Sequence, residues 1–272
     1  MTVSSRSIRL PLILGAFNMV LAIFAVFMMA VMVDSAKIDA QIDYGTFLEI
    51  FRYVATIEFA LILLIMPALT AGQISGERER KTLDLMLTTK IKPAGIVLGK
   101  LEVALSTVML LIVSSLPVIA LVFAYGGVTI SNIGLLFIAY IVAAFPMAAI
   151  GIWSSSLCSR STIATVISYV GSFVFLVVTL VGAVFSYNFR GSTGNWFNVM
   201  LANPGATFYA AIFGITGNRG AIEELAAVTG GNMGGLTQVQ WFLLGEAIQI
   251  VIAFILVAFA IRNVNPKQKR KK

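Results

Sequence analysis

Six long apolar segments dominate this sequence of 272 residues. A helix needs about 20 apolar residues to cross the hydrocarbon core of a bilayer, and each segment is long enough. Charged residues make up only 11% of the chain, against roughly 25% in ordinary soluble domains. We therefore predict an all-α, polytopic membrane protein whose residues 1–272 form a single transmembrane domain. The six predicted spans are Leu10–Val33, Phe51–Gly72, Ala94–Tyr125, Ile133–Leu157, Ser161–Tyr187 and Val239–Ile261.

Lysine and arginine residues predict the orientation of these spans. If the N-terminus is cytoplasmic, fifteen of the nineteen Lys and Arg residues lie on the cytoplasmic side. The positive-inside rule therefore predicts that both termini are cytoplasmic. We expect the protein to lie in the plasma membrane of a bacterial cell. The first apolar segment is longer than the hydrophobic part of a secretory signal, so we expect it to be retained. The basic run Lys267–Lys272 follows the last span and is expected to contact anionic lipids rather than nucleic acid.

The composition argues against an enzyme or a metal protein. The chain has no histidine, which removes the commonest general base and zinc ligand, and its single cysteine, Cys158, has no internal disulfide partner. Gly95, Gly99 and Lys100 fail the P-loop pattern, because the glycine spacing is short and Leu101 replaces the required hydroxyl residue. We therefore expect this chain to bind no metal, nucleotide or other cofactor.

Residues 73–93, between the second and third spans, are too rich in charge to lie in hydrocarbon. Leu83, Met86 and Leu87 recur at helical spacing, which predicts a short surface helix with one apolar stripe that Pro93 ends. The simplest interpretation is a charged loop with an interfacial helix. Alternatively, the stripe fits into a groove of a partner protein and the charges pair around its rim.

The order of motifs here resembles the type-2 ATP-binding-cassette (ABC) exporter permeases. The motifs are Glu77-Arg78-Glu79, the helix Thr82–Leu87, the pair Thr88-Thr89 and the sequence Leu98–Leu101 that opens the third span. The resemblance implies that residues 73–93 form a coupling helix that docks on a separate ATPase. It assigns this coupling to Glu77, Arg78, Glu79, Arg80, Thr82, Leu83, Met86 and Leu87.

The same resemblance implies a permease subunit that moves substrate with ATP hydrolysed by another chain. ATP and Mg would be bound by two ABC ATPase subunits, and a second permease, identical or paralogous, would complete the assembly, facing the second and fifth spans. Family members usually begin with an amphipathic elbow helix, whereas only Thr2–Arg9 precede the first span here, so the elbow is short or missing. The alternative function is a secondary transporter that couples transport to protons through carboxylates within the membrane.

Residues 188–238, on the outer side, contain an apolar segment too short to span. Asn203 is a favoured N-cap, Pro204 suits the first helical position, and Gly217 suits the end of a helix over Gly205–Ile215. We predict a re-entrant helix, which the resemblance identifies as an outer gate; an ordinary lid remains the alternative. A second short helix is predicted over Arg219–Val228.

Two carboxylates fall inside apolar spans. Glu58 and Glu246 are costly in hydrocarbon and are expected to face the bundle interior, about 10 Å below the outer surface. Gln249, one turn from Glu246, is placed to form a hydrogen bond with it. These three residues are candidates for a translocation path or outer cavity, or else for polar contacts that hold helices together.

Overall fold

The computed structural model describes residues 9–39, 44–88, 92–124, 129–190, 195–217 and 236–265. These ranges are helical and contain no strand. Six of the helices are long and apolar enough to cross a membrane, which confirms the predicted all-α fold with six spans. They are α1 (Arg9–Asp39), α2 (Tyr44–Ala71), α5 (Pro93–Ala124), α6 (Ile130–Leu157), α7 (Ser161–Arg190) and α10 (Gln238–Val264).

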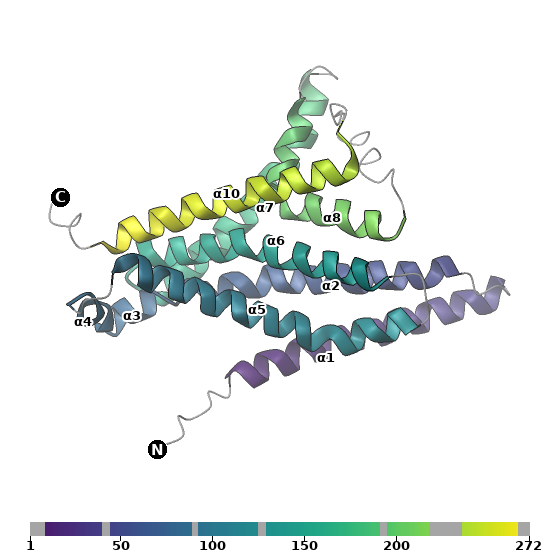
Figure 1. The fold of residues 1–272 in the computed structure, drawn as a ribbon, viewed down its shortest axis with the longest axis horizontal. Coiled ribbons are helices and arrows are strands. Elements are labelled where there is room, and N and C mark those ends of the chain that lie inside the picture. Colours follow the sequence, from purple (N-terminus) through teal and green to yellow (C-terminus); the bar gives the residue numbers. More distant parts are fainter. Residues whose placement is uncertain are drawn as a thin grey trace.

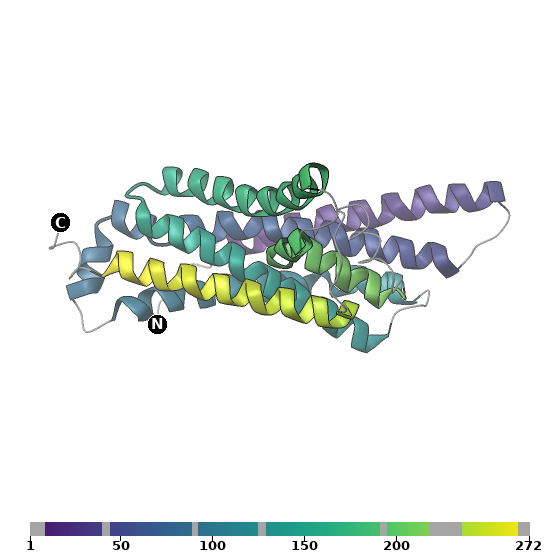
Figure 2. The ribbon, with the colours of Figure 1, turned by 90° about the horizontal axis from the view of Figure 1, so that it is seen from above.

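Four short helices lie at the two ends of the bundle. At one end, α3 (Ser75–Glu79) and α4 (Thr82–Thr88) lie beside the C-terminal end of α10 (Figure 1). Toward the other end, the 3-10 helix η1 (Asn195–Ala202) leads into α8 (Pro204–Ile215), which packs beside α10 (Figure 2). The fold therefore has one short-helix element at each end.

Helix α6 is the centre of the bundle and contacts α2, α5, α7, α8 and α10. Its buried face is built largely from small side chains, which let neighbouring backbones approach closely, as is common in membrane bundles. At Gly151 the space is too small for a side chain, because a Cβ atom there would lie 1.8 Å from Thr70 Oγ1 of α2. The small buried residues of α6 are Ala139, Ala143, Ala144, Ala148, Ala149, Gly151, Ser154, Ser155 and Ser156.

The peripheral helices expose apolar side chains, as expected of surfaces that face lipid. Helix α1 lies at the edge of the described bundle, where it packs mainly on α2 and α5. Helix α7 exposes a row of apolar side chains that includes Val166, Val170 and Phe173. Helices α2, α5 and α6 each contain an internal proline, yet each is one continuous helix. Neighbouring helices in a bundle compensate for the hydrogen bonds that such prolines remove.

One detail differs from the sequence predictions, and three predicted features lie outside the described residues. Pro93 does not end the surface helix: α4 already ends at Thr88, and Pro93 is the first residue of α5. This position suits proline because the first helical N–H has no partner within the helix. The predicted elbow region before Arg9, the helix Arg219–Val228 and the basic run Lys267–Lys272 lie outside the described residues.

Candidate functional site

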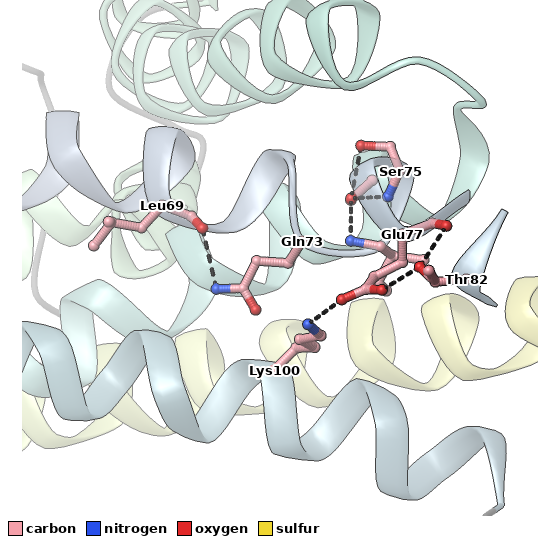
Figure 3. Close-up of polar contacts among 8 residues, drawn as sticks. Leu69, Gln73, Ser75, Glu77, Thr82 and Lys100 are labelled. Atoms are coloured by element: carbon pink, nitrogen blue, oxygen red, sulfur yellow. Dashed lines mark hydrogen bonds and ion pairs between the residues drawn. The ribbon is translucent and has the colours of Figure 1, made fainter. Parts of the chain in front are cut away.

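At the end of the bundle where α3 and α4 lie, Glu77 ties three helices together. Its Oε1 atom lies 3.0 Å from Lys100 Nζ of α5, and its Oε2 atom accepts a hydrogen bond of 2.5 Å from Thr82 Oγ1, at the start of α4 (Figure 3). The Lys100 and Glu77 side chains are each 28% exposed, so water screens this ion pair only in part. Glu77 therefore fixes the corner between α3 and α4 against α5.

Arg78 and Glu79 fix the same corner against α6 and α7. The Arg78 guanidinium donates to the carbonyl oxygens of Cys158, at 2.8 Å, and Ser156, at 3.0 Å, at the C-terminal end of α6. The Glu79 carboxylate accepts hydrogen bonds from the backbone N–H and the hydroxyl of Ser161, the first residue of α7. A carboxylate at a helix N-terminus and a cation at a C-terminus are both favourable positions.

A serine of α6 completes this anchor. Ser155 Oγ accepts hydrogen bonds of 2.9 Å from the backbone N–H groups of Ile74 and Ser75, where α2 passes into α3. These N–H groups at the start of a short helix have no partner within it, so the serine supplies a missing acceptor. Neither Ser155 nor Ser161 could be identified from the sequence, because each lies about 80 residues along the chain from the groups it binds.

The apolar stripe of α4 faces inward in the structure. Leu83 is 3% exposed and belongs to the main hydrophobic core, and Leu87 packs against that core. The bundle itself therefore covers Leu83, whereas Met86 and Leu87 are half-buried, and docking of this stripe on a partner stays a prediction. The apolar side chain that α4 presents outward is Leu85, which is 67% exposed.

Two exposed basic residues precede α4. Arg80 and Lys81 are both exposed at the turn between α3 and α4. Lys81 adopts a left-handed backbone conformation with a φ of 59°, which is unfavourable by about 1–2 kcal/mol for a residue with a Cβ atom. Such conformations often occur at functional positions. We call the exposed set Arg80, Lys81, Leu85 and Thr88 the α4 face.

At the opposite end of the bundle, the predicted N-cap of α8 is confirmed. Asn203 is the N-cap, with its Oδ1 atom accepting from Gly205 N at 2.8 Å, and Pro204 is the first helical residue. The Asn203 amide also donates to Thr179 Oγ1 and the Leu176 carbonyl of α7, each at 2.8 Å. The C-cap is Thr216 rather than Gly217, which follows it with a positive φ of 86°.

Helix α8 is held against the bundle rather than lying loosely over it. The Phe208 ring stacks on Phe59 of α2, with 4.0 Å between the ring centroids, and on Tyr140 of α6. The guanidinium of Arg52 lies 4.9 Å from the centre of the Phe213 ring. Contacts of these kinds join α8 to α2 and α6, so movement of α8 would require these rings to separate.

Glu58 is fully buried, which confirms that it faces the bundle interior. Its Oε1 atom accepts a short hydrogen bond from Ser115 Oγ of α5. Tyr140 of α6 donates to the Ala55 carbonyl, one turn before Glu58 on α2, at 2.9 Å. Glu58 Oε2 has no hydrogen-bond partner among the described residues. The sequence predicted the burial of Glu58 but not its contacts with other spans.

Glu246 and Gln249 are also buried, but they do not form the expected hydrogen bond with each other. Gln249 Nε2 instead donates to Thr207 Oγ1 of α8, at 2.9 Å, and to the Leu201 carbonyl of η1, at 3.4 Å. Both partners come from the segment formed by η1 and α8, which the spacing of residues on α10 cannot reveal. Within the described ranges, Glu58 and Glu246 have no hydrogen-bond partner in common.

Among the described residues, no group of three or more His, Cys, Asp or Glu side chains could hold a metal ion. Cys158 is buried. The polar side chains described above gather in two places. Those of Glu77, Arg78 and Glu79 anchor the corner between α3 and α4, and those of Glu246 and Gln249 are buried beneath α8.

A comparison with protein families identifies this architecture. The model for the family described as "ABC-2 family transporter protein" matches residues 32–262, from the end of α1 almost to the end of α10. No curated protein matches the chain. Because the family match spans most of the sequence and five of the six membrane helices nearly in full, the chain belongs to the ABC-2 transporter family and is a multi-pass permease subunit of an ABC transporter.

Proposed function

We propose that this permease exports its substrate with energy from ATP hydrolysed, together with Mg, by two separate ABC ATPase subunits. The observation that carries the proposal is the anchored corner between α3 and α4. The α4 face offers one exposed leucine and two exposed basic residues, while Glu77, Arg78 and Glu79 join the corner to three membrane helices. An exposed apolar residue with a charged rim suits docking on another protein.

The anchoring contacts explain how movement of a docked ATPase would reach the membrane. A force on α4 passes through Glu77 and Lys100 to α5, through Arg78 to the end of α6, and through Glu79 to the start of α7. In this account Glu77, Arg78 and Glu79 transmit motion from within the chain, and Leu85 contacts the ATPase. Thr82, Leu83, Met86 and Leu87 build the short helix that presents Leu85.

A second permease chain completes the proposed pathway. Helices α2 and α7 lie together, with the Tyr169 hydroxyl donating to the Leu64 carbonyl at 3.1 Å, and both expose apolar side chains such as Leu64 and Phe173. We propose that this paired surface faces the second permease. The buried groups of Glu58, Glu246 and Gln249 would then line the moving parts, and α8, capped by Asn203 and Pro204, would act as the outer gate.

The orientation follows from the same proposal. ATP is cytoplasmic, so the α4 face and the C-terminal end of α10 lie in the cytoplasm, and α8 lies at the outer side of the plasma membrane, as the positive-inside rule predicts for a bacterial protein. A proton-coupled secondary transporter is the competing function, because Glu58 and Glu246 are buried carboxylates with unpartnered oxygens within the described ranges.

Labelling of the two ends of α6 tests the orientation. We expect a Ser131→Cys variant, at the outer end, to react with a membrane-impermeant maleimide in intact cells, and a Ser159→Cys variant to react only after permeabilisation. Both serines are exposed, so a cysteine at either position can react. The test uses a Cys158→Ala background, so that the introduced cysteine is the one that is labelled. Labelling of Ser159→Cys but not Ser131→Cys in intact cells would place the α4 face outside and rule out ATPase docking there.

A further inference from the structure

Three buried oxygen atoms lie beneath the outer segment without hydrogen-bond donors. They are both carboxylate oxygens of Glu246 and Oε1 of Gln249, and none has a partner within the described parts of the chain. Glu246 is 6% exposed and Gln249 is fully buried. Buried polar atoms nearly always have a hydrogen-bond partner. Three acceptor oxygens without one, on two residues that lie one helical turn apart, therefore need an explanation.

The orientation of the Gln249 amide is fixed by its neighbours. Its nitrogen faces the Leu201 carbonyl, which can only accept a hydrogen bond, and it also donates to Thr207 Oγ1. Turning the amide over would place two oxygens against each other. Oε1 is therefore held in place as an acceptor, on the same helix as the Glu246 carboxylate.

If Glu246 is ionised, this region carries one negative charge. Neither of the two ion pairs among the described residues involves Glu246. The N-terminal turns of α8 lie nearby, with Thr207 beside Gly245 of α10, and a helix N-terminus favours the ionised carboxylate. A buried carboxylate without a partner is costly in a membrane protein, and a bound cation would remove that cost.

The packing around Gly245 limits what can bind. A Cβ atom at Gly245 would lie 2.3 Å from Thr207 Cγ2 and 3.1 Å from the Leu201 carbonyl oxygen, so α10 lies directly against α8 and η1. A ligand in this region must be small, or must enter with a small charged group. With one carboxylate, a singly charged ligand is neutralised, whereas a divalent ion would leave a net positive charge in the membrane.

We propose that Glu246 and Gln249 form a binding site for a singly charged cation, either an alkali ion or a primary ammonium group. Three orphan oxygens match the three N–H donors of a primary ammonium, and carboxylate and amide oxygens also bind hard metal ions. This inference rests on the proposed pathway, for which it names a ligand class. The binding test uses this chain alone. Cation binding can therefore be disproved while coupling to an ATPase is upheld, and coupling can be disproved while cation binding is upheld.

The test is equilibrium binding to the purified permease in detergent, in choline chloride, because choline has no N–H donors. The probes are ²²Na⁺ and radiolabelled ethylammonium. We expect one site per chain for at least one probe, with affinity reduced about tenfold or more in Glu246→Gln, since bonds to a charged group are lost. Gln249→Met keeps the charge but removes the fixed acceptor, and it is expected to weaken binding by a smaller factor.

Glu102→Gln is the matched control, because this carboxylate is exposed on α5, and its binding should equal wild type. Saturable Na⁺ binding that needs Glu246 would identify an alkali ion site, and ethylammonium binding alone would identify an ammonium site. Absence of binding for both probes would overturn the proposal. If neither probe bound and Glu246→Gln removed a pH dependence of the unfolding temperature, a proton shared with Gln249 Oε1 would replace the cation.

Discussion

Leu85→Asp is expected to prevent an ATPase subunit from binding while the membrane bundle stays folded. Leu85 is 67% exposed and belongs to no core cluster, so its replacement costs the permease little stability. A hot-spot residue at the centre of an interface contributes about 2 kcal/mol or more, so if Leu85 is the anchor of this interface, affinity for the ATPase falls about 30-fold or more. Pull-down of the ATPase with a tagged permease, together with ATP hydrolysis by the purified complex, measures the loss.

Leu83→Asp is the matched comparison on the same helix. Leu83 is 3% exposed, so an aspartate there puts a charge into the core and should lower the amount of folded permease itself. Size-exclusion profiles in detergent separate the two effects. Wild-type ATPase binding by a well-folded Leu85→Asp permease would show that the α4 face is not the docking surface.

Arg78→Met is expected to destabilise the end of the bundle where α3 and α4 lie and to uncouple ATP hydrolysis from transport. The methionine fills similar space but leaves the carbonyls of Ser156 and Cys158 without the guanidinium. Each hydrogen bond to a charged group contributes about 1.5–3 kcal/mol. Because the substitution removes two such bonds, we expect the free energy of unfolding to fall by about 3 kcal/mol. A lower unfolding temperature of the purified permease reports it.

Arg80→Met provides the control for Arg78→Met, since Arg80 is the exposed neighbour on the α4 face. Its unfolding temperature should match that of wild type, with any defect confined to ATPase binding. The two variants thus separate anchoring inside the chain from docking outside it. Equal unfolding temperatures for Arg78→Met and Arg80→Met would contradict the anchoring role.

The membrane helices could be predicted from the sequence because their formation depends on length and apolar composition alone. In a bilayer every backbone polar group must be satisfied within the segment, so an apolar run of sufficient length has little choice but a helix. The cap of α8 was equally local, since Asn203 and Pro204 act on the residues that follow them directly. These features needed no knowledge of how the helices pack.

The features that could not be predicted depended on contacts between distant segments. A helix as short as α4 offers Leu83 and Leu85 to opposite sides, and only the packed bundle decides which side it covers. The spacing of Glu246 and Gln249 suggested a direct bond, but Thr207 of α8 competes for the amide. Ser115 could not be identified as the partner of Glu58, because hydroxyl side chains in apolar spans often bond only to their own backbone.

The composition of the particle purified from native membranes tests the central claim most directly. A tagged copy of this permease should be recovered, by native mass spectrometry, with two ABC ATPase chains and one further permease chain. The particle should hydrolyse ATP, and the Leu85→Asp variant should be recovered without the ATPase and without this activity. An intact permease particle that carries no ATPase, yet moves substrate when a proton gradient is imposed, would contradict the account and favour a secondary transporter.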